Sequence, residues 1–151
     1  MSGRCLPAGR HGVDDIAIGD WIATAAVTIT ADMIDRFAEL SGDYFEIHMQ
    51  DDAAKAHGFD RRVAHGLLIL AMVDGLKNQT DAQFKAQASL GWDWSFRAPV
   101  LLGDEISARL TVLEKTAISD PARGILTIGF KVTNQRQELV QEGQNRLMAY
   151  R

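Results

Sequence analysis

The feature that most constrains the fold is an apolar stretch over residues 63–77, which predicts a helix. Apolar side chains would cover almost the whole circumference of this helix: Val63, Leu67, Leu68, Ile69, Leu70, Met72, Val73 and Leu76. A helix that is apolar on all sides has to be covered by other parts of the fold. Its most apolar part, 63–73, is too short to span a membrane and is followed by Asp74 and Lys77. We therefore expect a buried helix and no contact with a membrane.

The second half of the chain has the pattern of β-strands. Apolar and polar residues alternate most clearly at Ile106, Ala108, Leu110 and Val112, and again at Leu126, Ile128, Phe130 and Val132. The segments between these runs carry turn residues such as Gly103, Asp120-Pro121 and Gly124. The pattern predicts four antiparallel strands, over 88–97, 105–115, 124–134 and 138–150.

The first half predicts one strand followed by helices. Residues 21–29 alternate as a strand, and Thr30 is placed to cap a helix over 33–40 that ends at Gly42. We expect 43–50 to be a loop, and a short helix capped by Asp51 or Asp52 to end at Gly58.

This order of elements indicates an α+β fold. A curved antiparallel sheet of about five strands, wrapped around the long central helix, is the simplest way to bury that helix. No repeat or linker divides the chain, so we expect one domain over 1–151, with 1–12 as a flexible leader.

Composition narrows the classes of function. The 151 residues have a formal net charge of −4, which argues against a nucleic-acid-binding surface. The leader lacks the apolar run of a signal peptide, and the single cysteine, Cys5, fits a reducing compartment. We therefore expect a cytoplasmic location.

The segment with the most chemical information is Ser41-Gly42-Asp43-Tyr44-Phe45-Glu46-Ile47-His48, followed by Ala64-His65-Gly66. A carboxylate and an imidazole five positions apart, in an apolar setting, can hold one water and move its proton. Gly66 is at the start of the predicted central helix, where a backbone N–H stabilises negative charge on a carbonyl oxygen. We predict Asp43 and His48 as the catalytic pair and the Gly66 amide as the oxyanion donor.

These residues resemble the signature of the MaoC-like hydratases, the family of (R)-specific enoyl-CoA hydratases. The usual signature is Ser-Gly-Asp, a variable residue, Asn-Pro, an aliphatic residue and His, followed later by Gly-Phe and Ala-His-Gly. The later stretch Trp92-Asp93-Trp94-Ser95-Phe96-Arg97-Ala98-Pro99-Val100 also resembles the family, and the resemblance covers about 21–151. It implies a hotdog fold and reversible hydration of trans-2-enoyl-CoA to (R)-3-hydroxyacyl-CoA.

The chain departs from the signature at one point, where Phe45-Glu46 stands in place of Asn-Pro. We expect Phe45 to line the acyl pocket, and Glu46 to be either a solvated charge or a polar contact for an unusual acyl group. We also expect substrate contacts from Ile47, His65 and Leu67, with a structural hydrogen bond at His65.

Other residues are assigned more ordinary places. His11 and His57 are expected on the surface, and Trp92 and Trp94 in the core or at a dimer interface. For Arg61, Arg62 and Arg97 we leave open a solvated position or a contact with the phosphates of the ligand. The four histidines lack the tight pairing of zinc ligands, so we expect no metal and no cofactor beyond the coenzyme A thioester substrate.

Sheet edges need covering, and hotdog proteins join their sheets edge to edge, so the resemblance implies a homodimer or a higher homo-oligomer. Two other functions remain open. One is an acyl-CoA thioesterase on the same fold, and the other is a non-catalytic acyl-CoA-binding subunit, which the Phe45-Glu46 departure favours.

Overall fold

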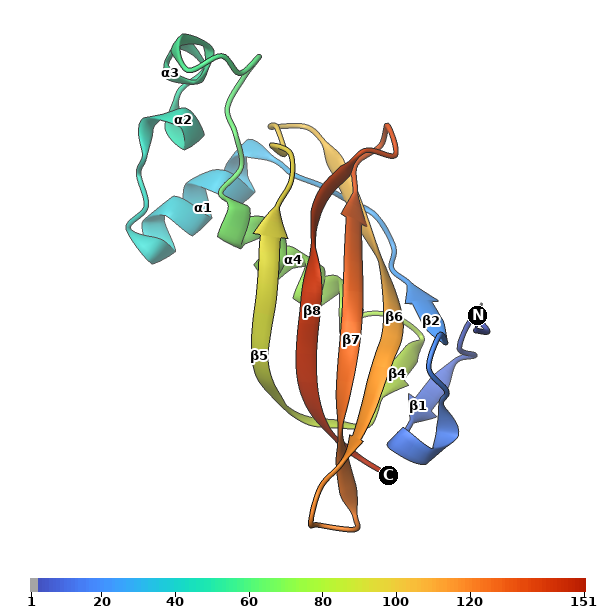
Figure 1. The fold of residues 1–151 in the computed structure, drawn as a ribbon. Helices are drawn as coiled ribbons and strands as arrows, with labels where there is room; N and C mark the ends of the chain where they lie inside the picture. The colour runs from blue at the N-terminus through green and yellow to red at the C-terminus, as the bar shows by residue number, and fades with distance from the viewer. Residues whose placement is uncertain (1–2) are drawn as a thin grey trace.

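The computed structural model describes residues 3–151 and consists of a curved sheet with helices on one face (Figure 1). The main sheet has the strand order β2-β6-β7-β8-β5, with β3 also paired to β6, and all these pairs are antiparallel. Its strands are β2 (Trp21–Ala23), β3 (Val27–Thr28), β5 (Ala86–Phe96), β6 (Glu105–Ala117), β7 (Arg123–Thr133) and β8 (Leu139–Tyr150). The four strands expected in the second half are confirmed to within two residues at each end.

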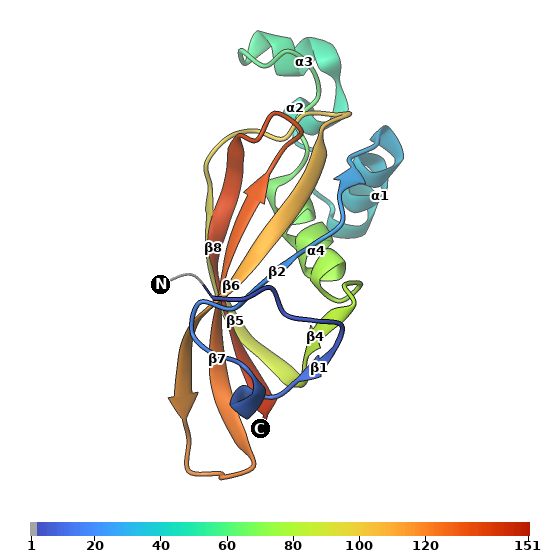
Figure 2. The ribbon, with the colours of Figure 1, turned by 90° about the vertical axis from the view of Figure 1, so that its right-hand side faces the viewer.

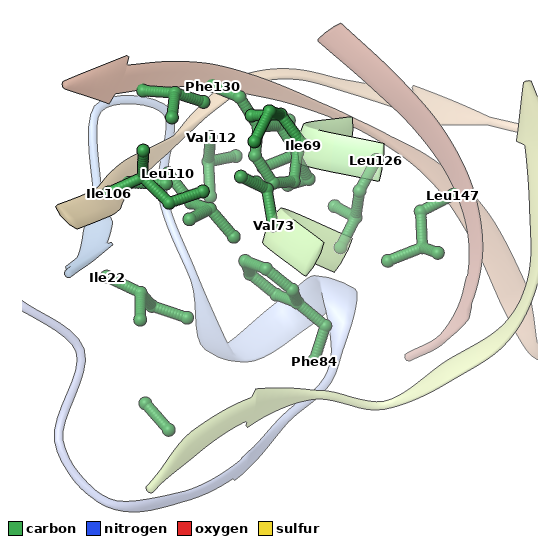
Figure 3. Packing of buried hydrophobic residues seen from close by; sticks show 14 of the residues in the cluster. Ile22, Ile69, Val73, Phe84, Ile106, Leu110, Val112, Leu126, Phe130 and Leu147 are labelled. Carbon is green, nitrogen blue, oxygen red and sulfur yellow. The ribbon is translucent and has the colours of Figure 1, made fainter. Parts of the chain in front are cut away.

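The central helix α4 (Gly66–Lys77) lies along the concave face of this sheet, as Figure 2 shows edge-on. Ile69 and Val73 are fully buried against the sheet residues Leu110, Leu126 and Phe130 (Figure 3). Leu67 is 62% exposed, so the helix is not covered on every side as its composition suggests.

The helix α4 begins three residues later than predicted. Residues 63–65 are extended, because the Val63 N–H donates to the Ile47 carbonyl and the Ala64 N–H donates to the Val100 carbonyl. Val63 also forms a bridge with Leu101. Apolar residues occur in buried strands and in buried helices alike, so composition alone does not locate this boundary.

The strand expected over 21–29 is interrupted. β2 and β3 both pair with β6, but between them the Thr24 hydroxyl accepts the hydrogen bond of the Ala108 N–H. A side chain thus takes the place of a backbone partner, and the ladder breaks at this point.

Three helices form a cap at one end of the sheet, with α2 and α3 beyond the ends of the strands and α1 beside α4 (Figures 1 and 2). They are α1 (Ala31–Ser41), α2 (Glu46–Met49) and α3 (Asp51–Ala56). Thr30 caps α1 through the Met33 N–H, and Gly42 ends it in a left-handed conformation with φ of 78°, both as expected. The prediction of a loop over 43–50 is wrong in part, because α2 occupies the second half of this segment. The carboxylates of Asp51 and Asp52 do not cap α3, which follows Gln50 without a side-chain cap.

The leader expected to be flexible over 1–12 is packed against the fold from residue 3 onward. β1 (Gly9–His11) pairs in parallel with β4 (Ala82–Phe84), and a 3-10 helix, η1 (Val13–Asp15), follows. Leu6 is buried. His11 is buried as well, so the surface position expected for it is wrong, and its Nε2 lies 2.7 Å from the Pro7 carbonyl oxygen. Strands of three residues with little alternation are not visible in a sequence pattern. Met1 and Ser2 lie outside the described residues.

Among the helices of residues 3–151, none combines the length and the apolar composition needed to cross a membrane.

Candidate active site

A cavity of about 520 Å3 opens where α4 begins, between the cap and the end of β5. The cap contributes Asp43 and His48, and the start of α4 contributes His65, Gly66 and Leu67. The remaining wall comes from the sheet and its connections: Phe59, Phe96, Ala98, Pro99, Val100 and Gln141 among others. Residues that are 98 positions apart in the chain therefore meet in one pocket.

The Asp43 carboxylate is placed by its own loop. The left-handed Gly42 ends α1, and the Asp43 N–H then donates to the Ser41 hydroxyl at 3.1 Å. The Asp43 Oδ1 accepts from the Phe45 N–H at 3.2 Å, as in an Asx turn. This leaves Oδ2 directed toward His48, with a distance of 4.0 Å between Oδ2 and the His48 Nε2.

The His48 imidazole is buried and held in one orientation. Its Nδ1 lies 2.7 Å from the Val63 carbonyl oxygen, which can only accept, so Nδ1 carries the hydrogen. Nε2 is then the unprotonated nitrogen of the neutral ring and faces Asp43. Burial lowers the pKa of His48 below its ordinary 6.5, and the neighbouring His65 and Arg62 act in the same direction. The neutral form is therefore favoured.

Arg62 fixes the helix α2, which carries His48. Its Nε donates to the His48 carbonyl oxygen at 2.6 Å, and its guanidinium also pairs with Asp35 on α1. The Arg62 N–H donates to the Asp51 carboxylate at 2.9 Å. The side chain of Arg62 is 13% exposed. Arg62 is thus an internal link of the cap, whereas Arg61 binds the Leu102 carbonyl oxygen and Asp104.

His65 lies between the catalytic candidates. Its ring stacks on the His48 ring with centroids 4.0 Å apart, and its Nε2 lies 2.9 Å from the Asp43 carbonyl oxygen. The structural hydrogen bond expected at His65 is therefore present. His65 is 2% exposed and also lines the cavity.

Gly66 is the first residue of α4, and its N–H donates to no acceptor within residues 3–151. A free N–H at a helix start is a donor with a favourable dipole. A Cβ at position 66 would come within 2.3 Å of the Phe96 ring, so Phe96 can cover this residue only because it is glycine.

Two of the expected substrate contacts are not on the cavity wall. Phe45 is 52% exposed and packs beside the rings of His48 and His57, and Ile47 is only half-buried. Phe45 precedes α2 and Ile47 is next to His48 within it, but neither side chain lines the pocket. Leu67 and His65 do line it. Gln141 was not predicted as a site residue. The sequence feature that could have identified it is a polar residue at an inward-facing position of a predicted strand.

Glu46 is exposed, as expected of a solvated charge, and it does not line the cavity. Its Oε1 lies 2.9 Å from the His57 Nε2, and this pair joins the start of α2 to the end of α3. Phe45 has φ of −54° and ψ of 133°, which lies outside the α region that a following proline disfavours. The backbone at Phe45 is thus compatible with the Asn-Pro of the signature, and in this chain the Glu46–His57 contact links α2 to α3.

The fold also brings Asp43, His48 and His65 into a group whose possible ligand atoms lie within 4.8 Å of one another. The spacing in the sequence gave no sign of this group. The two imidazoles are stacked, with planes 29° apart and centroids 4.0 Å apart, so their lone pairs lie in two separate and nearly parallel planes. Metal coordination needs lone pairs that converge on one point about 2.0–2.1 Å away. These residues therefore do not fit a metal ion.

Together, the curved sheet around α4 and the cavity at the start of that helix define a hotdog-fold protein with an acid–imidazole pocket. A double-hotdog protein of Mycobacterium tuberculosis, Rv0216, has the same fold, with a TM-score of 0.79 over 93% of this chain and 44% of that one, at 18% identity. The model of the MaoC-like domain matches residues 16–134, which is most of the chain. The chain belongs to the MaoC-like domain family.

Two proteins with similar sequence or structure illustrate this membership. The chain is 32% identical over 108 residues to an (R)-specific enoyl-CoA hydratase of Aeromonas caviae, covering 72% of this chain and 77% of that protein. A MaoC-like dehydratase of Rhodospirillum rubrum has a structure with a TM-score of 0.84 at 28% identity, covering 93% and 97% of the two chains. Across the first three curated relatives, the match spans 77%, 32% and 52% of their length.

Proposed function

We propose that this protein is a hydro-lyase that adds water to trans-2-enoyl-CoA, giving (R)-3-hydroxyacyl-CoA, and catalyses the reverse elimination. The observation that carries the proposal is the 4.0 Å separation of the Asp43 Oδ2 from the His48 Nε2 on a cavity wall that also contains Gly66. This gap is too long for a direct hydrogen bond, and it leaves room for one oxygen atom to contact both groups.

The chemistry balances with these groups alone. The water held by Asp43 and His48 loses a proton to the pair as its oxygen bonds to C3 of the enoyl group. Electrons move through the conjugated system toward the thioester oxygen, where the Gly66 N–H donates. The pair then returns a proton to C2, so the site ends in its starting protonation state and needs no metal or further cofactor. A donor of the Gly66 kind contributes about 2.7–4 kcal/mol to transition-state stabilisation.

The names of the relatives support a hydratase or dehydratase over a thioesterase. They include (R)-specific enoyl-CoA hydratases and a 3-hydroxyacyl-[acyl-carrier-protein] dehydratase. The departure from Asn-Pro is weak support for a non-catalytic subunit, because Asp43 and His48 still meet on one cavity wall in its absence.

We propose further that the protein acts as a homodimer in the cytoplasm. β5 lies at the edge of the sheet beside the cavity, where Phe96 is 56% exposed and Leu67 is 62% exposed. An edge strand with apolar neighbours is suited to pairing with a second copy. Light scattering should then give twice the 16.6 kDa mass of one chain, and a mass of 16.6 kDa would contradict the dimer.

The test of the reaction uses crotonyl-CoA and a series of longer enoyl thioesters. Loss of enoyl absorbance without release of free thiol, with a 3R product by chiral chromatography, is the expected result. Release of thiol would indicate a thioesterase, and binding without turnover would indicate a non-catalytic subunit. Asp43→Asn should abolish most turnover, whereas Asp52→Asn, an exposed carboxylate on α3, should leave it unchanged.

A further inference from the structure

Gln141 connects the sheet to the first residue of the central helix. It lies in β8, is 2% exposed, and lines the cavity of the candidate site. Its Oε1 accepts a hydrogen bond of 2.8 Å from the Trp94 indole, and its Nε2 donates one of 3.1 Å to the Gly66 carbonyl oxygen. Its partner in the register across β5 and β8 is Phe96, whose ring lies against Gly66.

The orientation of this amide is fixed by its partners. The Trp94 indole N–H can only donate, so the atom that faces it must be the Gln141 oxygen. The Gly66 carbonyl can only accept, so the atom that faces it must be the nitrogen. Rotating the amide by half a turn would set donor against donor and acceptor against acceptor. The side chain therefore has one arrangement that satisfies both neighbours.

Gly66 is held by the first turn of α4 on the side of the helix, and its remaining side is less restrained. His65, the N-cap residue of α4, makes no side-chain capping bond, and glycine is the most flexible residue in its backbone. Two contacts from the sheet hold Gly66 in place: the Phe96 ring packs against its Cα side, and Gln141 holds its carbonyl.

We propose that Gln141 is a positioning residue that sets the direction of the Gly66 N–H toward the thioester oxygen. This inference rests on the proposed function, in which that N–H carries the developing negative charge. Such a donor works only about 2.7–3.1 Å from the oxygen in the transition state. A misplacement of about 1 Å costs on the order of 100-fold in rate.

The first arm of the test compares the same substitution at two ends of α4. Gln141→Met removes the bond to Gly66, and Gln83→Met removes the bonds that Gln83 donates to the Lys77 and Thr80 carbonyls near the other end of the helix. Gln141→Met should lower kcat by about 10- to 100-fold with little change in KM, because the contact acts in the transition state. Gln83→Met should keep the wild-type kcat. Equal kcat values for the two variants, measured on folded protein, would overturn the proposal.

The second arm uses charge. In Gln141→Glu, a carboxylate still accepts from the Trp94 indole but cannot donate to the Gly66 carbonyl, whereas the protonated acid can. The kcat of Gln141→Glu relative to wild type should therefore rise as the pH falls, and the same ratio for Gln141→Met should stay flat. A flat ratio for both variants would count against the positioning role. Trp94→Phe, which frees the amide to rotate, should lower kcat less than Gln141→Met does.

A third arm does not depend on turnover. The Gly66 amide peak in a nitrogen–proton correlation spectrum should move in Gln141→Met and stay in place in Gln83→Met. If wild-type protein turns over no thioester, the proposed function fails while this spectrum still decides whether Gln141 holds Gly66. An unmoved Gly66 peak in Gln141→Met would overturn the inference even in an active enzyme.

Discussion

The sheet with α4 and the helical cap are held together by different interactions. Between the sheet and α4, apolar side chains such as Ile69, Leu110 and Phe130 are at most 1% exposed and pack on one another. In the cap, α2 is tied down by polar contacts, chiefly those of Arg62 with the His48 carbonyl and Asp35. Apolar packing therefore sets the shape of the cavity, and a few polar contacts set where the imidazole lies in it. Changes in the apolar core between the sheet and α4 should act mainly on stability, and changes in the polar contacts of the cap mainly on turnover.

The largest expected effect is on stability. Phe130→Ala removes a ring that is 1% exposed and lies 5.2 Å from the Trp92 ring and 5.7 Å from the Trp94 ring between centroids. It should lower the free energy of unfolding by about 3–5 kcal/mol. Phe45→Ala, the same change at a 52% exposed position of the cap, should cost far less. Urea unfolding measures both, and similar losses would remove the distinction between the two regions.

Arg62→Met should remove the main polar contacts that hold α2 in the cap. Loss of the bonds to the His48 carbonyl oxygen and Asp35 frees α2 to shift, and we expect kcat to fall by about 10-fold or more. Arg61→Met is the matched control, because Arg61 binds the Leu102 carbonyl and Asp104 rather than α2. Both variants should lose some stability, but only Arg62→Met should lose turnover on folded protein. An equal effect on kcat would show that Arg62 does not position His48.

The pH dependence sharpens the same contrast. Burial lowers the pKa of His48 below its ordinary 6.5, and catalysis uses the neutral ring. The acid limb of kcat/KM should therefore lie below pH 6.5. The unfolded chain binds this proton first as the pH falls, so the His48 contribution to stability is complete above about pH 6.5 and is lost below it. Proton NMR titration of His48 checks the order, and a pKa above 6.5 would contradict it.

The smallest expected effect comes from Glu46→Pro. Position 46 is the first residue of α2, where proline is well tolerated, and Phe45 lies outside the α region that a following proline disfavours. The proline should raise the free energy of unfolding by about 0.4–1 kcal/mol, because it restricts the unfolded chain. Loss of the contact between Glu46 and His57 should offset this gain. Thermal unfolding should give a melting temperature close to that of wild type, with turnover retained. A large loss would show that the Glu46–His57 pair contributes more than a proline at position 46 does.

How much of the molecule is predictable from its sequence follows the same division. The alternation of residues such as Ile106, Ala108 and Leu110 locates the strands, because a two-sided sheet separates core from solvent every second residue. The end of α1 at Gly42 is likewise predictable from the sequence, because glycine readily takes the left-handed conformation that ends a helix. The start of α4 is not, because Val63 and Ala64 are drawn into extended structure by Ile47 and Val100.

The candidate site divides in a similar way. The signature placed Asp43, His48 and Gly66 together, and the fold brings all three to one cavity. Whether the side chains of Phe45 and Ile47 reach the cavity depends on the orientation of α2. A helix of four residues is too short for a sequence pattern to predict that orientation. Gln141 comes from a strand 75 residues after Gly66, so its role depends on strand pairing that a linear pattern does not contain.

The most direct test of the account is a double-mutant cycle on crotonyl-CoA hydration with Asp43→Asn, His48→Ala and the double variant. If both side chains act on one water, either single change should lower kcat by about 100- to 10,000-fold, and the double variant should be no slower than the worse single variant. If the two losses instead multiply in the double variant, Asp43 and His48 act independently, and the shared water at the centre of the account does not exist.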